Sequence, residues 1–250
     1  MMTPILSVQD LKKIFTRNGQ DDFLAVDGVS FDISAGECVG LIGESGSGKS
    51  TVANMIARLL DPNAGRIFLD GEDVTTAEVR SIFRTVQMIF QSPQESFDPR
   101  RTLGDGIGES LLNVGQSRAE VREEVGRLLE AVGLSPGFAE RYPHEVSGGQ
   151  CQRAAIARAI AIEPKLLICD EATSALDVTV QAEIVALLSR LMRERGMACL
   201  FICHDIALAQ SVCDRFLVMY RGKIVEEGAP DEVVQSPKRE YTKMLIESVL

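Results

Sequence analysis

Residues 43–50 read GESGSGKS and stand between two segments with different apolar patterns. The run ECVGLIG, which ends at Gly43, is typical of a buried strand, and TVANMIARLL at residues 51–60 has the periodicity of a helix that ends at a Pro and Gly stop. The stretch fits the pattern G-x-x-x-x-G-K-[ST] in the strand, loop and helix setting that this pattern requires. It therefore predicts a phosphate-binding loop.

The residue types of this loop suit a nucleotide with Mg²⁺. Glycines leave room for backbone N–H groups to converge on phosphates, and the helix that follows turns its positive end toward them. We expect Lys49 to reach the β and γ phosphates, Ser50 to give its hydroxyl to Mg²⁺, and Thr51 to lie near the α phosphate. The predicted nucleotide-binding residues of the loop are Gly43, Glu44, Ser45, Gly46, Ser47, Gly48, Lys49, Ser50 and Thr51.

An acidic pair follows the apolar run KLLIC at residues 165–169. A carboxylate at the end of such a strand sits beside the loop in this type of fold, so Asp170 is expected to hold Mg²⁺ through its water shell. Glu171 is placed to polarise a water for attack on the γ phosphate. The alternative is that Glu171 merely solvates the end of the strand.

Composition bounds the class of protein. The chain has 250 residues, of which 45% are hydrophobic, enough for a packed core. Its 26 Lys and Arg against 36 Asp and Glu give a net charge of −10, which argues against a general nucleic-acid or anionic-membrane surface. No apolar run reaches the roughly 18 residues of a membrane span, and the N-terminus lacks a signal-peptide pattern. We therefore expect a soluble chain unless a partner holds it at a membrane.

The six cysteines lie mostly inside apolar runs and lack the paired spacing of a disulfide or zinc framework. We interpret them as reduced core thiols. Cys199, Cys203 and His204 could suggest a metal site, but on the strand that ACLFIC predicts the two cysteines would stand about 13 Å apart. His204 would face the other way from Cys203 on that strand.

Three parts of the chain differ in pattern. Residues 5–40 alternate short apolar segments with turns, as in a small sheet, and RIFLDGEDV predicts a hairpin that turns on Asp70 and Gly71. Residues 92–109 are turn-rich and the segment after them is charged and helical, which indicates a mainly helical insertion up to about residue 145. After residue 150, helices alternate with apolar strands, which predicts an α/β core with a parallel sheet.

Six motifs occur in one order along the chain: GESGSGKS, the glutamine of QMIFQSP, SGGQ, the acidic pair of CDE, SALD and the histidine of FICHD. In order and approximate spacing they resemble the nucleotide-binding subunits of ABC transporters over nearly the whole chain. The resemblance implies an α/β fold: a P-loop NTPase core of the ABC ATPase type with an antiparallel β subdomain and a helical insertion. In a single domain of residues 1–250, the core and β subdomain would comprise 1–91 and 151–228, the helical subdomain 92–150 and a tail 229–250.

The same resemblance implies ATP as the nucleotide and assigns roles to further residues. Gln91 would contact Mg²⁺ or the attacking water, and His204 would hydrogen-bond the γ phosphate, although a lone histidine is usually structural. Phe15 would stack on adenine, unless it is a strand residue in the core, and Asp177 would pack across a dimer interface. The predicted catalytic residues are Glu171, His204, Gln91 and Lys49, and the predicted metal ligands are Ser50, Gln91 and Asp170.

SGGQ at residues 147–150 is a second glycine-rich stretch and stands at the start of a predicted helix. Its small residues expose backbone N–H groups, its serine adds a hydroxyl, and the helix N-terminus adds partial positive charge. Without a ligand such a stretch is a helix cap. The resemblance implies instead that it binds the γ phosphate of an ATP held by a second subunit in a head-to-tail dimer. The residues concerned are Ser147, Gly148, Gly149 and Gln150.

Longer matches, including YPHEVSGGQCQRAAIARA and SALDVTVQAEI, resemble the ATPases of bacterial oligopeptide, dipeptide and nickel importers. That branch implies two membrane permease subunits, a second ATPase subunit that is identical or paralogous, and an extracytoplasmic solute-binding protein. It also implies a peripheral position on the cytoplasmic face of the inner membrane. The cargo stays open between peptides and nickel or metallophores.

Three residues depart from the pattern of the family. In this family SGGQ is called the signature motif. Val146 stands where leucine normally precedes the serine of the signature, and Cys151 follows the signature where a polar or basic residue is usual. Ala172 replaces the proline after the acidic pair. None of these changes removes a catalytic group, so we expect an active enzyme. The alternative function is a non-transport ABC ATPase that acts on nucleic acid or ribosomes. Against it, the chain has no sustained heptads, no CxxC pairs and one P-loop.

Overall fold

The computed structural model describes residues 4–16, 22–173 and 176–248 of the chain. Within them a six-stranded sheet has the order β10-β9-β3-β8-β7-β6, in which β10 pairs antiparallel with β9 and the other neighbours are parallel. Its strands are β3 (Cys38–Ile42), β6 (Val86–Ile89), β7 (Leu166–Asp170), β8 (Ala198–Ile202), β9 (Arg215–Tyr220) and β10 (Lys223–Gly228). The predicted parallel α/β core is confirmed.

A second, antiparallel sheet has the order β2-β1-β4-β5. Its strands are β1 (Leu6–Phe15), β2 (Phe23–Ile33), β4 (Ala64–Leu69) and β5 (Glu72–Asp73). The hairpin predicted at Asp70 and Gly71 is present, and both residues have positive φ angles, 53° and 84°. Two successive positive φ angles match the right-handed twist of the flanking strands. The expected fold class, a P-loop core with an antiparallel β subdomain and helices, is therefore correct.

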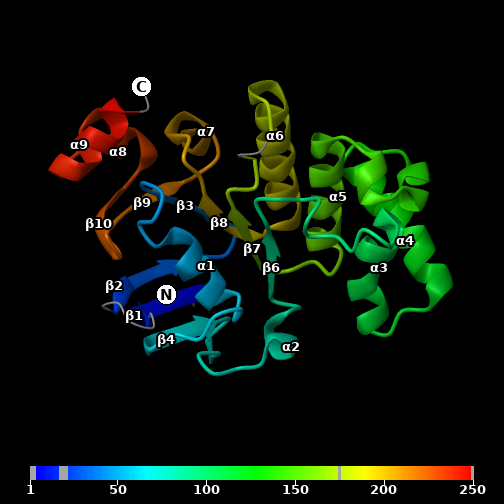
Figure 1. The fold of residues 1–250 in the computed structure, drawn as a ribbon, viewed down its shortest axis with the longest axis horizontal. Coiled ribbons are helices and arrows are strands. Elements are labelled where there is room, and N and C mark those ends of the chain that lie inside the picture. Colours follow the sequence, from blue (N-terminus) through cyan, green and yellow to red (C-terminus); the bar gives the residue numbers. More distant parts are fainter. Residues whose placement is uncertain (1–3, 17–21, 174–175, 249–250) are drawn as a thin grey trace.

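Three of the helices lie on the side of the molecule opposite the antiparallel sheet. Figure 1 shows α3, α4 and α5 together on one side of the molecule, and β1, β2, β4 and α1 on the other. The helices of the described residues are α1 (Lys49–Ile56), α2 (Val79–Ile82), α3 (Leu103–Asn113), α4 (Arg118–Ala131), α5 (Gly148–Ile160), α6 (Val178–Arg195), α7 (Ile206–Gln210), α8 (Pro230–Gln235) and α9 (Glu240–Glu247).

Strand β3 is buried on both faces and separates two apolar clusters. Val39 and Leu41 join the cluster that contains α1 and the antiparallel sheet, whereas Cys38 and Ile42 join the cluster that contains α3 to α6. Successive side chains of a strand point to opposite faces, so this alternation follows from the sequence CVGLI. The residue that follows β3, Gly43, is thereby held at a fixed place in the middle of the fold.

Helix α1 is shorter than the helix predicted over 51–60. It ends at Ile56, and Arg58 adopts a left-handed conformation with φ 59°. The N–H of Leu59 then donates to the carbonyl of Asn54 at 2.9 Å, a six-residue closure typical of a helix C-terminus. The backbone thus stops the helix before the Pro and Gly signal is reached.

The expectation that residues 92–109 are turns is wrong for their second half, where α3 begins. Thr102 and Asp105 form a capping box, in which each side chain accepts a bond from the backbone N–H of the other. The glycines of this segment serve packing, since a Cβ at Gly106 would lie 2.6 Å from the ring of Phe97. A sequence that resembles a loop is therefore a helix in close contact with its neighbour.

All six cysteines are free and buried, as predicted. The Sγ atoms of Cys38 and Cys213 are 3.7 Å apart, the distance of a contact between two thiols. Within the described residues, no group of three or more His, Cys, Asp and Glu side chains could hold a metal ion. In the same part of the chain, none of the helices combines the length and the apolar character of a membrane span.

Candidate nucleotide-binding site

The carboxyl ends of four neighbouring parallel strands meet at one edge of the large sheet. The glycine-rich loop follows β3, Gln91 lies just beyond β6, Asp170 ends β7, and His204 lies two residues beyond β8. In open α/β sheets the crevice outside these strand ends is where ligands bind. The topology thus gathers most of the predicted site residues from distant parts of the sequence.

Two glycines of the loop have no room for a side chain. Gly43 has φ 151° and a Cβ there would lie 2.2 Å from the carbonyl oxygen of Met219. Gly48 has φ 110° and a Cβ there would lie 2.5 Å from the carbonyl oxygen of Ala25. At Gly46, with φ 80°, a Cβ would meet no atom within 4 Å, so this side of the loop faces open space. The loop therefore packs against the protein backbone at Gly43 and Gly48 and is open at Gly46.

Lys49 lies at the mouth of the loop with only 3% of its surface exposed. Its Nζ donates to the carbonyl oxygens of Gly43 and Glu44, both at 2.8 Å. Burial lowers the pKa of Lys49, while the charges of Glu171 and Asp170 oppose that shift. An ammonium group has three donors, so one remains for a phosphate oxygen.

Ser50 and Asp170 form an oxygen pair beside Lys49. The hydroxyl of Ser50 donates to Oδ1 of Asp170 at 2.9 Å. Burial raises the pKa of Asp170 above its ordinary value of 3.8, and the bond from Ser50 opposes this shift. Mg²⁺ prefers oxygen ligands and is usually held by one or two protein groups together with phosphates. The pair fits Mg²⁺, because a cation there would offset the cost of burying the carboxylate.

The loop also contains a buried polar atom without a partner. The Oγ of Ser47 is buried and makes no hydrogen bond to any of the residues that the structure describes. Buried polar groups are almost always satisfied by protein, water or ligand. Together with the open side of Gly46, this hydroxyl supports the fit of a phosphate to the loop.

Glu171 and His204 form the second polar pair of the site. His204 Nε2 lies 2.5 Å from Oε1 of Glu171, and the histidine side chain is 43% exposed. Glu171 has φ 50°, a left-handed conformation that is unfavourable for a residue with a side chain, and its N–H donates to the carbonyl of Ile202 at 3.0 Å. The chain therefore turns abruptly after β7 and directs this carboxylate toward His204. Ala172, in place of the usual proline, is buried after this turn.

The remaining residues assigned by the family resemblance lie at the periphery. Gln91 is exposed in the bend after β6. Phe15 ends β1 opposite Phe23, is partly buried and has Lys13 Nζ 5.3 Å from its ring centroid. Asp177 caps α6 by accepting a bond from the N–H of Val180 at 3.1 Å. The first two residues of the SALD motif, 174–175, lie outside the described residues.

The second glycine-rich stretch forms the start of α5, in a different part of the molecule from α1 (Figure 1). Ser147 Oγ accepts from the N–H of Gln150 at 3.2 Å, and Gln150 Oε1 accepts from the N–H of Ser147 at 2.9 Å. Gly148 and Gly149 are the first two helical residues, and a Cβ at Gly149 would lie 2.8 Å from Cγ1 of Val180. Within the chain this stretch is therefore a capped helix end and does not join the loop at 43–50.

The unusual residues on either side of the signature point into the core. Val146 is 9% exposed and Cys151 is fully buried. Burial raises the pKa of the Cys151 thiol to about 11, so the side chain is an apolar, protonated group at neutral pH. Because neither side chain faces solvent, both substitutions act on packing behind the signature.

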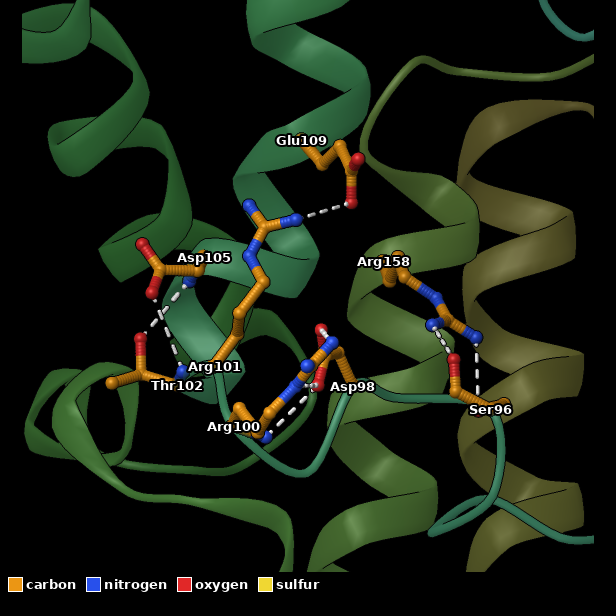
Figure 2. Close-up of polar contacts among 8 residues, drawn as sticks. All are labelled: Ser96, Asp98, Arg100, Arg101, Thr102, Asp105, Glu109 and Arg158. Carbon is orange, nitrogen blue, oxygen red and sulfur yellow. Dashed lines mark hydrogen bonds and ion pairs between the residues drawn. The ribbon is translucent and has the colours of Figure 1, made fainter.

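The sequence did not single out a contact that joins the loop after Gln91 to the signature helix (Figure 2). Arg158 of α5 donates to the carbonyl and to the Oγ of Ser96, the latter at 2.9 Å, and its guanidinium lies 4.3 Å from the ring centroid of Phe97. The only signal in the sequence is a cation inside an alanine-rich helix. Its partner lies 62 residues away and cannot be identified from the local pattern.

A glycine-rich loop between a buried strand and a helix, with a lysine, a serine and a carboxylate pair at one sheet edge, defines a P-loop nucleotide-binding protein. The comparisons with known proteins identify the family. The model of the family described as ABC transporter matches residues 26–174. The chain belongs to the ABC transporter family and is an ATPase of that family.

Named relatives cover nearly all of the chain. It is 45% identical to the oligopeptide transport ATP-binding protein OppF of Salmonella typhimurium, over 98% of this chain and 77% of that protein. It is 43% identical to OppF of Bacillus subtilis, over 100% of this chain and 83% of that protein. A putative peptide import ATP-binding protein of Brucella ovis is 44% identical, over 99% of this chain and 79% of that protein.

Solved structures agree with the fold. The dimeric ATP-binding cassette MJ0796, in a post-hydrolysis state bound to ADP and Pi, superimposes with a TM-score of 0.82 at 28% identity. That match covers 90% of this chain and 98% of the other. CbiO1 from Clostridium perfringens, part of the ABC transporter complex cbiONQ, gives a TM-score of 0.81 at 29% identity over 93% of this chain and 91% of the other.

Proposed function

We propose that the chain is the ATP-hydrolysing subunit of an importer that takes up oligopeptides through membrane permease partners. The observation that carries this proposal is the meeting of two polar pairs, Ser50 with Asp170 and Glu171 with His204, beside the loop of Lys49. This arrangement has a place for a cation, a base for water and a donor for phosphate. The similarity to proteins named for oligopeptide transport supports the cargo.

The residues of the site have separable roles in this proposal. Backbone N–H groups of the loop and Lys49 bind the phosphates of ATP, and Ser50, Asp170 and Gln91 hold Mg²⁺, which would stabilise charge on the phosphates. Glu171 accepts a proton from the attacking water, since the turn after β7 holds its carboxylate against His204 beside the loop. His204 fixes the orientation of that carboxylate and is available to the γ phosphate. Phe15 stacks on the adenine from the antiparallel sheet.

The signature would complete the site of another subunit. In a head-to-tail dimer, Ser147 to Gln150 of one chain cover the ATP held at residues 43–51 of its partner. Two observations support this proposal: the stretches lie in separate parts of one chain, and the superimposed cassette MJ0796 is described as dimeric. Asp177, beside the signature at the start of α6, would lie at the same interface.

We place the permease contact on the helical subdomain, residues 92–150. Between α3 and α4 lies a cavity of about 470 Å³ that is lined by apolar Leu112, Val121 and Val125 together with Arg118 and Arg122. Such a mixed surface suits a short segment of a membrane partner.

The core, 1–91 and 151–228, binds the nucleotide, and the tail follows from residue 229. In the importer the chain would lie at the cytoplasmic face of the inner membrane, and an extracytoplasmic solute-binding protein would deliver the cargo.

The test is to purify the chain with its permeases and binding protein, reconstitute them in lipid, and measure ATPase activity with peptides and with nickel chelates. We expect peptides of defined length to stimulate turnover severalfold. The same complex with Glu171→Gln serves as the control for contaminating ATPase. Stimulation by nickel chelates alone would replace the peptide cargo with a metal. Recovery of ribosomes or nucleic acid in place of permeases would overturn the proposal in favour of the non-transport alternative.

A further inference from the structure

Tyr241, in the last helix of the described residues, reaches the phosphate-binding loop. The backbone N–H of Glu44, the second residue of the loop, donates to the hydroxyl of Tyr241 at 3.0 Å. The two residues are 197 positions apart in the sequence. Tyr241 is 7% exposed, so this bond is largely shielded from water.

The tail that carries Tyr241 is fixed in place by two further contacts. The carboxylate of Glu226, on β10, accepts bonds from the N–H groups of Lys238 and Arg239 at 2.8 and 3.0 Å, directly before α9. The ring of Tyr241 stacks on that of Tyr220, at the end of β9, with 4.0 Å between centroids. Figure 1 shows α8 and α9 beside β10. The hydroxyl is thus presented to the loop by a side chain that has little freedom to move.

Both backbone polar groups of Glu44 are held by hydrogen bonds. Its carbonyl oxygen accepts a bond from Lys49 Nζ at 2.8 Å, and its N–H is bound by Tyr241. The neighbouring Gly43 is packed against the backbone of Met219, one residue before Tyr220, so strand β9 supports the same turn of the loop. When the remaining donor of Lys49 binds a phosphate, the bond that the N–H of Glu44 donates to Tyr241 would hold the loop in its open shape.

We propose that Tyr241 is a positioning residue for ATP: it preorganises the phosphate-binding loop from the C-terminal tail and thereby sets nucleotide affinity. This inference rests on the proposed assignment of residues 43–51 as the phosphate site. A binding site whose shape is fixed before the ligand arrives has less conformational entropy to lose. Loss of the hydroxyl should therefore weaken ATP binding and leave the chemical step unchanged.

The test uses Tyr241→Phe, which removes the hydroxyl and keeps the stacked ring, in the full chain. Tyr220→Phe is the matched control, because it removes a hydroxyl from the other ring of the stack and leaves the bond to Glu44 in place. Equilibrium binding of MgATP is measured in a Glu171→Gln background, and KM and kcat are measured in the reconstituted complex. For one neutral hydrogen bond we expect Kd and KM to rise roughly two- to tenfold with kcat unchanged. The control should match the parent.

The outcomes separate this inference from the site assignment. Lys49→Ala is carried through the same binding assay. If Lys49→Ala weakens ATP binding and Tyr241→Phe does not, the role of Tyr241 is overturned and the phosphate site stands. If neither variant changes Kd, the assignment of the loop itself is wrong. An equal effect of Tyr220→Phe, or a fall in kcat without a change in KM, would reduce Tyr241 to a packing residue.

Discussion

The two glycine-rich stretches of this chain are built in opposite ways. The loop at 43–50 is held by distant parts of the molecule: Met219 and Ala25 press against its glycines, Asp170 binds Ser50 and Tyr241 binds Glu44. The stretch at 147–150 makes its capping hydrogen bonds internally, because Ser147 and Gln150 bind each other across one helical turn.

This difference shows which contacts determine the conformation of each stretch. The loop depends on the whole fold and is formed before a phosphate arrives, as electrostatic stabilisation requires. The signature is a local structure that would form on any helix with the same cap. A stretch whose capping hydrogen bonds are made within itself is suited to act on a second chain.

The largest expected effect concerns Glu171, the proposed base beside the loop. Glu171→Gln keeps the size of the side chain and removes the negative charge that accepts the proton of the attacking water, so turnover should fall by about 100-fold or more. Binding of MgATP should persist, which equilibrium binding of labelled ATP would measure in parallel. Full activity in this variant would mean that the chemistry does not depend on Glu171.

The next effect separates binding from turnover. Lys49→Ala should weaken ATP binding by the isolated chain by on the order of 10- to 100-fold, the range for a hydrogen bond to a charged group. Ser147→Arg should leave that binding unchanged and stop hydrolysis in the assembled complex, because the arginine would block the partner's site. Equal loss of binding in both variants would contradict the division between the two stretches.

A smaller effect is expected on protein stability when one glycine of each stretch is replaced by alanine. Gly43→Ala should destabilise the protein by about 2 kcal/mol or more, since the methyl group would collide with Met219 at a φ that alanine rarely adopts. Gly148→Ala should change stability by less than about 0.5 kcal/mol, because its methyl would lie 3.5 Å from Leu176 in ordinary contact. Chemical denaturation would measure the free energy of unfolding of both variants. A similar loss in the two variants would contradict the predicted difference between the two stretches.

The smallest expected effect is the loss of stability when the helix cap in the signature is removed. Ser147→Ala removes the acceptor for the N–H of Gln150 and should cost about 1 kcal/mol of stability. Thermal unfolding without nucleotide measures this loss, with Ser135→Ala as a control at a serine whose side chain makes no cap bond to the turn that follows it. An unchanged midpoint would show that the stretch is not stabilised by its own cap.

Local patterns in the sequence predicted most of the fold. The strand before Gly43, the hairpin at Asp70 and the helices after residue 150 each carry a period or turn signal of their own. Helix α3 escaped prediction because its glycines resemble chain breakers. Only tertiary packing explains them, since a Cβ at Gly104, Gly106 or Gly108 would collide with Ala139, Phe97 or Val121, respectively.

The candidate site was predictable to the extent that its residues belong to ordered motifs. Those motifs led to Lys49, Ser50, Asp170, Glu171 and His204, and the sheet then brought these residues to one edge. What no local pattern could reveal is a bond between positions that are far apart in sequence. The contacts of Tyr241 with Glu44 and of Arg158 with Ser96 depend on how the tail and helices pack. The roles of all the predicted site residues, Gln91, Phe15 and Asp177 among them, stay predictions.

The burial of every cysteine has a practical consequence for spectroscopy. The most accessible of the six, Cys213, exposes only 8% of its surface, and burial raises the pKa values of Cys151 and Cys203 to about 11. Thiols that are shielded in this way react slowly with alkylating dyes. A substitution such as Met244→Cys, at a side chain of α9 that is 53% exposed, would therefore attach a fluorophore to the tail without a cysteine-free background.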